Sequence, residues 1–171
     1  LDLGRGAQGT VTSTTLSDVE TGIAAHGTVS VTLRHSTVTG AAENGISLHN
    51  AGRVDAADLH LVKNRRNGLV VGGGATRVST LRDVTATGNG HAGLMVAGGA
   101  APVVVRLHSD HNGNAGAVLR AAGRTTIVDA RSTAETTGVR IQDGQPATIS
   151  NLVAIGDGTE ANYVAMQRHA L

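Results

Sequence analysis

Glu43-Asn-Gly-Ile-Ser-Leu-His49 and Arg66-Asn-Gly-Leu-Val-Val-Gly72 decide the fold, because the second stretch repeats the pattern of the first 23 residues later. In both, an Asn-Gly pair opens a short run of alternating apolar side chains. The full set of Gly-led copies is Gly22-Ile-Ala-Ala-His26, Gly45-Ile-Ser-Leu-His49, Gly68-Leu-Val-Val-Gly72, Gly93-Leu-Met-Val-Ala97, Gly116-Ala-Val-Leu-Arg120 and Gly138-Val-Arg-Ile-Gln142, followed by the degenerate Asn162-Tyr-Val-Ala-Met166. Successive copies lie 22 to 25 residues apart, so the chain is built from internal repeats.

Each period contains a second block, in which apolar positions stand on both sides of a short polar step. Examples are Leu33-Arg-His-Ser36-Thr-Val38, Leu81-Arg-Asp-Val84-Thr-Ala86 and Ile127-Val-Asp-Ala130-Arg-Ser132. The alternation has a period of two residues, which predicts β-strands. Both prolines, Pro102 and Pro146, fall between the blocks. No ten-residue helical pattern occurs, so we expect an all-β chain with three short strands per period.

The composition sets further limits on the class of protein. The chain has 171 residues, 24 glycines, no Phe or Trp and one tyrosine, Tyr163, so its core is built from small and β-branched side chains. No cysteine is present, which excludes disulfide scaffolds, Cys-based zinc sites and thiol nucleophiles. A formal net charge of +1 gives no reason to expect a nucleic-acid or anionic-membrane partner. The longest apolar runs are too short for membrane insertion, and the first residue, Leu1, suggests a mature or excised form.

Three strands in 22 to 25 residues leave no room for a helix and describe one coil of a parallel β-helix. About seven coils at roughly 4.8 Å each predict a rod about 35 Å long. The repeats resemble those of the right-handed parallel β-helix family, including its pectate-lyase-like members, in which repeats end in an Asn-Gly-Ile-type strand. The matching residues are Glu43-Asn-Gly-Ile46, Arg66-Asn-Gly-Leu69 and Asn112-Gly-Asn-Ala-Gly116. The resemblance covers residues 11–166 and implies a single β-helix domain over 1–171, part of a longer protein.

The resemblance also supplies names for the parts of a coil. The Gly-led strand corresponds to PB1, and it is followed by turn T1, strand PB2, turn T2, strand PB3 and turn T3. The polar step is then T2, where short polar side chains are able to bond the backbone of the turn. The residues in this T2 column are His35, Asp58, Asp83, Arg106, Asp129 and Asn151.

Alternation along PB1 predicts which side chains form the core. The inward positions are Ile23, Ala25, Ile46, Leu48, Leu69, Val71, Leu94, Val96, Leu119, Val139 and Ile141. The outward positions are Ala24, Ser47, Val70, Met95, Val118, Arg140 and Val164, with His26, His49, Gly72, Ala97, Arg120 and Gln142 beside them. In polysaccharide-processing relatives this outer PB1 face, walled by T1 and T3, holds the sugar chain.

Catalysis is not predicted by these outward residues. Lyase or epimerase chemistry on a uronate needs a base for the C5 proton and cations for the carboxylate, and Val70, Met95 and Val118 provide neither. The calcium-binding carboxylate cluster of the family is missing from this face. The epimerase signature Asp-Pro-His-Asp is also absent, and its nearest counterpart is Ser109-Asp-His-Asn112. We therefore assign no catalytic residue, expect no cofactor or metal, and leave open whether the chain is a polysaccharide lyase, epimerase or glycoside hydrolase.

Positively charged residues provide the candidate binding site. Arg65, Arg66, His91 and His111 occur in T3 segments, so we expect them to form a cationic rim along one edge of PB1. Arg120 and Arg140, together with Gln142, form a second patch that suits an acidic sugar or phosphate. His26 and His49 stand one coil apart and are interpreted as stacked surface histidines.

Two functions of different class fit this sequence. The first is a secreted or cell-surface β-helix that binds an extended, acidic polysaccharide along PB1. The alternative is a non-catalytic spacer or partner-binding scaffold of the adhesin or tailspike kind. For the alternative, we expect Val70, Met95 and Val118 to form an exposed apolar band that, with the open ends of the helix, mediates self-association or binding of a protein partner.

Overall fold

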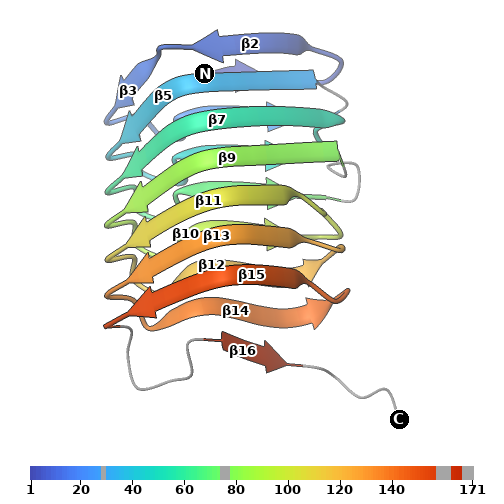
Figure 1. Cartoon of the computed structure of the whole chain (residues 1–171). Coiled ribbons are helices and arrows are strands. Elements are labelled where there is room, and N and C mark those ends of the chain that lie inside the picture. The colour runs from blue at the N-terminus through green and yellow to red at the C-terminus, as the bar shows by residue number, and fades with distance from the viewer. Residues whose placement is uncertain (28–29, 74–77, 157–162, 167–171) are drawn as a thin grey trace.

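The structure is a computed structural model that describes residues 1–27, 30–73, 78–156 and 163–166. In these ranges the chain forms sixteen strands and no helix (Figure 1). One sheet contains the PB1 strands, in the order β1 (Asp2–Leu3), β4 (Ile23–His26), β6 (Ile46–His49), β8 (Leu69–Gly72), β10 (Ala92–Ala97), β12 (Ala115–Ala122), β14 (Thr137–Gly144) and β16 (Tyr163–Met166). The second sheet contains β2 (Gln8–Thr12), β3 (Thr15–Ser17), β5 (Ser30–Thr39), β7 (Arg53–Val62), β9 (Val78–Thr87), β11 (Val103–Asp110), β13 (Thr126–Thr133) and β15 (Thr148–Ile155).

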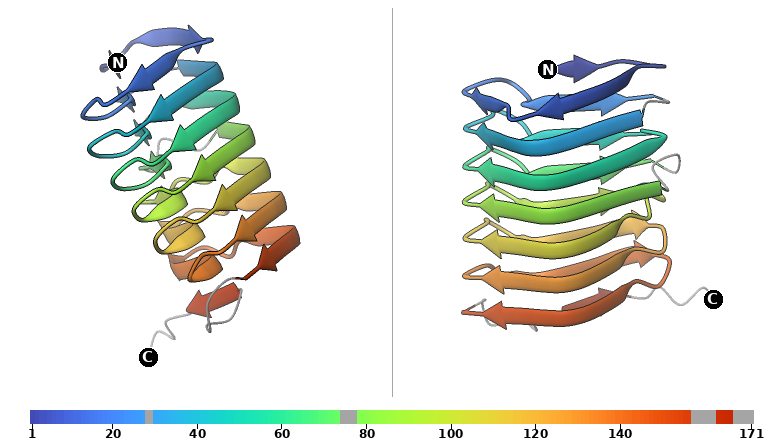
Figure 2. Two further views of the ribbon diagram at one scale, coloured as in Figure 1. Left: turned by 90° about the vertical axis from the view of Figure 1, so that its left-hand side faces the viewer. Right: turned by 45° about the horizontal axis from the view of Figure 1, so that its top comes forward.

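The chain alternates between the two sheets, so that every strand pairs in parallel with the equivalent strand of the next coil (Figures 1 and 2). Ile46 lies opposite Leu69, for example, and Val96 opposite Leu119. From β1 to β14 the chain makes about six turns, and β16 begins the next one. The predicted right-handed parallel β-helix is therefore confirmed, with close to the expected number of coils. Asn162, the first residue of the degenerate repeat, lies outside the described residues.

Backbone positions in the left-handed conformation form three columns along the molecule, one for each corner of the coil. The T2 column has φ between 49° and 57° at Ser13, His35, Asp58, Asp83, Arg106, Asp129 and Asn151. The T3 column consists of Asp18, Gly40, Lys63, Gly88, His111, Ala134 and Gly156, and the T1 column includes Gly27, Asn50, Gly73, Gly98, Ala121 and Asp143, all with positive φ. Each coil thus turns at the same three corners.

The T2 corner is tighter than the sequence predicts. A single left-handed residue bends the chain there, so PB2 and PB3 run as one continuous strand in β5, β7, β9, β11, β13 and β15. Only the first coil separates them, as β2 and β3. Asp and Asn adopt the left-handed region more readily than other side chains, which accounts for the polar character of this column.

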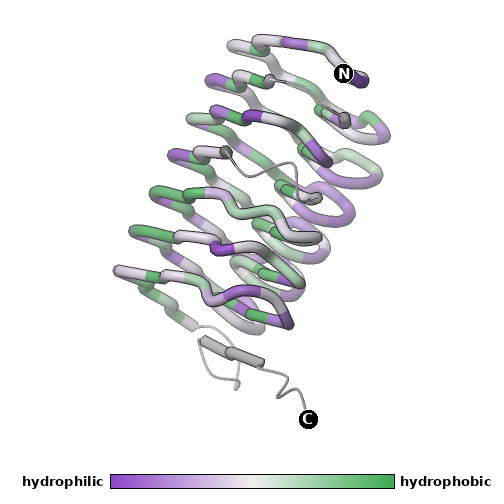
Figure 3. Tube along the Cα trace, turned by 90° about the vertical axis from the view of Figure 1, so that its right-hand side faces the viewer, coloured by the Kyte–Doolittle hydropathy of each residue, from purple (hydrophilic) through white to green (hydrophobic). Residues whose placement is uncertain are grey.

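Inward-facing side chains fill the space between the sheets. All eleven predicted inward residues belong to the core cluster or pack against it, and Ile46, Leu48, Leu69 and Val71 are fully buried. In Figure 3 apolar segments recur at neighbouring places in successive coils. The predicted assignment of inward PB1 positions is confirmed, and the core is a stack of aliphatic layers.

The glycine just before or at the start of each PB1 strand from β4 to β12 is required by close packing of the coils. A Cβ atom at Gly22, Gly45, Gly68, Gly93 or Gly116 would lie 2.5–2.8 Å from the carbonyl oxygen of the equivalent glycine one coil further on. No side chain fits at such a distance. The repeated glycine therefore reflects coil spacing, since none of these five residues has a positive φ.

The prediction of an exposed apolar band on the outer PB1 face is wrong. Val70 exposes 7% of its surface and Val118 exposes 2%, while Met95 is half-buried. Val118 and Met95 pack with the buried Ala92 and Ala115 into a small second cluster. These alanines begin β10 and β12, where the chain arrives from T3, so the outer face is packed at this point instead of presenting a contact surface.

Candidate functional site

The T3 corner is built on a buried row of asparagines. Asn64, Asn89 and Asn112 lie on successive coils and are almost fully buried. The backbone amide of Asn64 donates to Oδ1 of Asn89 at 3.0 Å, and the amide of Asn89 donates to Oδ1 of Asn112 at 2.9 Å. The side-chain amide of Asn112 also donates to the Ala86 carbonyl at 3.0 Å. Because these bonds join neighbouring coils, they hold the T3 segments in fixed register.

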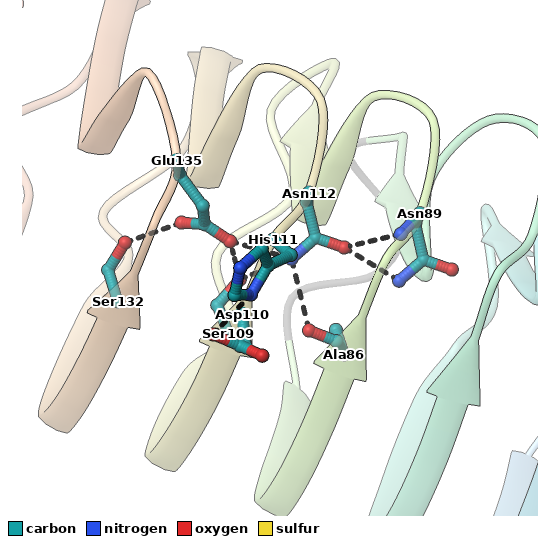
Figure 4. Close-up of polar contacts among 8 residues, drawn as sticks. All are labelled: Ala86, Asn89, Ser109, Asp110, His111, Asn112, Ser132 and Glu135. Atoms are coloured by element: carbon teal, nitrogen blue, oxygen red, sulfur yellow. Dashed lines mark hydrogen bonds and ion pairs between the residues drawn. The ribbon is translucent and has the colours of Figure 1, made fainter. Parts of the chain in front are cut away.

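Glu135 takes the place of asparagine at the C-terminal end of this row (Figure 4). Its carboxylate is buried, with 4% exposure, and accepts hydrogen bonds from Nδ2 of Asn112 and from Oγ of Ser109, each at 2.6 Å. It also accepts a bond from Oγ of Ser132. The buried carboxylate of Glu135, surrounded by donors in this way, has a structural role at the end of the asparagine row. It lies below the protein surface at T3.

The four rim residues predicted from the sequence lie on this T3 edge. The amide of His91 donates to the carbonyl of Arg66 at 2.8 Å, so these two residues stand one above the other on neighbouring coils. Arg65 precedes Arg66 in the same turn, and His111 is the left-handed corner residue of the next coil after His91. All four are exposed, as is Lys63 in the corner column. The structure thus brings the cationic rim together.

Two members of the rim have acidic neighbours. Nη1 of Arg66 lies 2.9 Å from Oε2 of Glu43, and Nδ1 of His111 lies 2.9 Å from Oδ1 of Asp110. Lys63, Arg65 and His91 form no ion pair with any residue that the structure describes. Among the described residues, Lys63 and Arg65 are therefore the unpaired Lys and Arg side chains of this rim.

The second predicted patch is divided by the structure. Nη1 of Arg140 donates to Oδ1 of Asn114 at 2.9 Å and Nη2 donates to Oγ1 of Thr137 at 3.2 Å, which ties Arg140 to the T3 side. Arg120 is exposed near the opposite end of β12, where it is in register with Gln142. Arg140 consequently belongs with the rim, whereas Arg120 stands apart from it.

The predicted histidine pair is present but is not arranged as a metal site. His26 and His49 are register partners on β4 and β6, and Nδ1 of His26 lies 3.4 Å from Oδ1 of Asp2. Gly72 makes room for the His49 ring, because a Cβ atom there would lie 2.5 Å from its Nδ1. Among the described residues, no group of three His, Asp or Glu side chains is placed to hold a metal ion.

A second polar surface, which the sequence interpretation missed, follows the T2 corner. Asp58 lies between two histidines, 2.7 Å from Nδ1 of His35 and 3.2 Å from Nε2 of His60. One coil further on, Asp83 accepts bonds from Nε and Nη2 of Arg106, the latter at 2.7 Å. The sequence contains a signal for these contacts, since oppositely charged residues occupy adjacent places in the T2 column.

These contacts change the acid–base properties of the T2 carboxylates. The hydrogen bond from His35 is the main reason that the pKa of Asp58 lies below its usual range. The hydrogen bond from Arg106 likewise lowers the pKa of Asp83, and the same bond raises the pKa of Arg106. Both aspartates therefore keep their negative charge to a lower pH than an isolated aspartate does.

A chain that coils between parallel sheets and turns at three fixed corners is a parallel β-solenoid. A family model described as "Right handed beta helix region" matches residues 44–165, more than half of the 171-residue chain. The chain belongs to this right-handed β-helix family. No curated protein and no solved structure gives a significant match. Within the described ranges, no helix capable of crossing a membrane is found.

Proposed function

We propose that this β-helix is a binding module of secreted or cell-surface type that holds an extended, acidic polysaccharide along its T3 edge. The observation that carries the proposal is the alignment of exposed basic side chains on three successive coils: Lys63, Arg65, Arg66, His91 and His111. A linear polyanion lying parallel to the stack meets basic side chains from three neighbouring coils, which are spaced about 4.8 Å apart.

The T3 edge is favoured over the middle of PB1 by burial. Val70 and Val118 are covered on the outer PB1 face, so they offer a sugar chain little area and no polar group. The T3 edge is exposed and its backbone is held by the buried asparagine row. A rigid base reduces the conformational entropy lost on binding, although exposed charges make the interaction weak and dependent on salt.

The experiment is isothermal titration of oligogalacturonate and oligoalginate into the full chain at low and high salt. We expect binding that weakens as salt rises, and a further loss in Arg65→Gln/His91→Gln. Arg53→Gln is the matched control, because Arg53 is exposed on β7, away from T3. Equal loss in both variants, or no binding of either uronate, would contradict the proposal. Unsaturated uronate product in the same solutions would show catalysis in addition to binding.

A partner-binding scaffold is the second candidate function, and the end of the second sheet favours it. β15 is the last strand in the described order of that sheet and pairs there only with β13. Its Val153 and Ile155 are 48% and 45% exposed. Unpaired strand edges with apolar side chains invite pairing with another chain, so β15 is where we place self-association or partner binding.

A further inference from the structure

The T2 corner carries a shallow depression of about 260 Å³ that spans four consecutive coils. It lies over the middle of the second sheet's strands, where T2 bends each strand, whereas T3 follows the end of each strand. Its lining contains three carboxylates, two guanidinium groups and one imidazole, from Asp58, Asp83, Asp129, Arg106, Arg131 and His108. The depression is thus separate from the cationic rim.

The polar groups of the depression are arranged as two parallel rows. Asp83, Arg106 and Asp129 occupy the T2 column on β9, β11 and β13. Two residues further along the same strands lie Thr85, His108 and Arg131, which are in direct register with one another. Neighbouring members of a row are about 4.8 Å apart along the backbone. The result is a regular grid of donors and acceptors over three coils.

Some of these donors and acceptors already form hydrogen bonds within the protein. Both oxygens of Asp83 accept bonds from Arg106, and Oδ1 of Asp129 accepts a bond from Nδ2 of Asn151 at 2.8 Å. In the described part of the chain, the side chains of Thr85, His108 and Arg131 have no hydrogen-bond or ion-pair partner, and no bond is made by Oδ2 of Asp129 or Nη1 of Arg106. Donors and an acceptor therefore remain available side by side.

The side chains of the depression do not favour a charged ligand or an apolar ligand. Three carboxylates face two guanidinium groups, so an anion or a cation attracted by one row member is repelled by the next. The only apolar lining residue is Leu107, which is buried, and no aromatic ring is present to bind an apolar ligand. A hydroxyl group both donates and accepts, and it thus satisfies Asp129 and Arg131 without a charge penalty.

We infer that the T2 depression binds a neutral, hydroxyl-rich ligand, of which an uncharged oligosaccharide is the extended form. Hydroxyls of such a ligand donate to Oδ2 of Asp129 and accept from the Arg131 guanidinium and the His108 ring. The Asp83–Arg106 pair holds Nε and Nη2 of Arg106, and Nη1 remains available as a further donor. This site is independent of the acidic polysaccharide proposed for T3.

The test is a titration of the ¹⁵N-labelled full chain with four neutral probes, cellohexaose, maltohexaose, mannohexaose and xylohexaose, followed by amide chemical shifts. We expect at least one probe to shift residues 83–85, 106–108 and 129–131, with an affinity that is the same at low and high salt. Shifts confined to T3, or none with any of the four probes, would overturn the inference. Because oligogalacturonate binding at T3 falls with salt, failure of one proposal is distinguishable from failure of the other.

A double variant and a control variant test whether Asp129 and Arg131 contact the ligand. Asp129→Asn/Arg131→Gln should weaken binding of the active probe by roughly fivefold or more, the loss of about one net hydrogen bond. Asn is tolerated at the left-handed position, and both residues are exposed, so the fold is retained. Arg53→Gln serves as the control and should leave the affinity unchanged. An unchanged affinity in the double variant would also overturn the inference.

Discussion

At the scale of single residues, the glycines at the starts of the PB1 strands show how closely the coils are packed. Gly68 precedes β8, and a Cβ atom there would lie 2.8 Å from the carbonyl oxygen of Gly93. That oxygen belongs to the backbone of the next coil and cannot move without disturbing the ladder. The contact is repeated at every PB1 start from Gly22 to Gly116.

We therefore expect Gly68→Ala to destabilise the chain by roughly 2 kcal/mol or more, because the added methyl group forces two coils apart. Gly4→Ala is the matched control, since nothing lies within 4 Å of a Cβ atom at Gly4 and its φ is not positive. Urea denaturation followed by circular dichroism measures both. Equal stabilities of the two variants would mean that the coils are less tightly spaced than described.

The T2 aspartates give a prediction about pH. The folded-state pKa values of Asp58 and Asp83 are lowered from the ordinary 3.8, so the bonds to His35 and Arg106 add stability above that pH. This stability is lost as the pH falls through the lowered pKa. Because both carboxylates are exposed, the effect is small at each site.

Asp58→Asn and Asp83→Asn should consequently have a lower Tm than the wild type at pH 6, and the difference should shrink as the pH falls from about 4 toward 2. Asn keeps the left-handed corner, so the backbone is unchanged. Asp18→Asn, at a T3 corner without an ion pair in the described chain, is the control. A wild-type advantage that stays constant across this pH range would contradict the proposed pairing.

At the scale of the strand, alternation determines which substitutions the fold accepts. Leu48 and Ser47 are adjacent residues of β6, but Leu48 is fully buried whereas Ser47 faces outward and is only partly covered. Leu48→Asp and Val96→Asp should prevent folding, because an unpaired carboxylate would enter the aliphatic stack. Ser47→Asp should fold. A far-ultraviolet circular dichroism spectrum of each variant is sufficient, and equal tolerance at positions 47 and 48 would show that the assignment of faces is wrong.

The strand pattern was readable from sequence because burial and alternation share one period. The Gly-led repeat placed Ile46, Leu48 and Val71 in the core, and it also located the T2 corner. It did not reveal that Val118 is covered, since alternation says which way a side chain points and nothing of what packs over it. Cross-coil contacts such as Asn89 with Asn112 were also missed. These asparagines recur once per coil, but the direction of a side chain at a turn does not follow the two-residue alternation of a strand.

At the scale of the whole molecule, β15 differs from the strands that come before it in its sheet. Every internal strand has a neighbour on both sides, but β15 has one neighbour among the described strands. If the second candidate function is correct, the isolated chain should associate through this edge at high concentration. Sedimentation velocity should then show oligomers for the wild type.

The variant Val153→Lys/Ile155→Lys should sediment as a monomer, since charged side chains on an edge strand oppose pairing. Val103→Lys is its control, because Val103 is 43% exposed but lies on the internal strand β11. A wild type that remains monomeric at every concentration would remove β15 as an association surface.

The three left-handed columns have a consequence for how the length of this molecule is set. Since Gly45 and Gly68 occupy equivalent places, excision of residues 46–68 would join Gly45 to Leu69 and leave every later corner in phase with the ones before it. Removal of a segment that is not a whole number of coils would displace all the corners that follow. The length of the rod therefore changes only by whole coils. The distance between sites along its edges changes by the same steps.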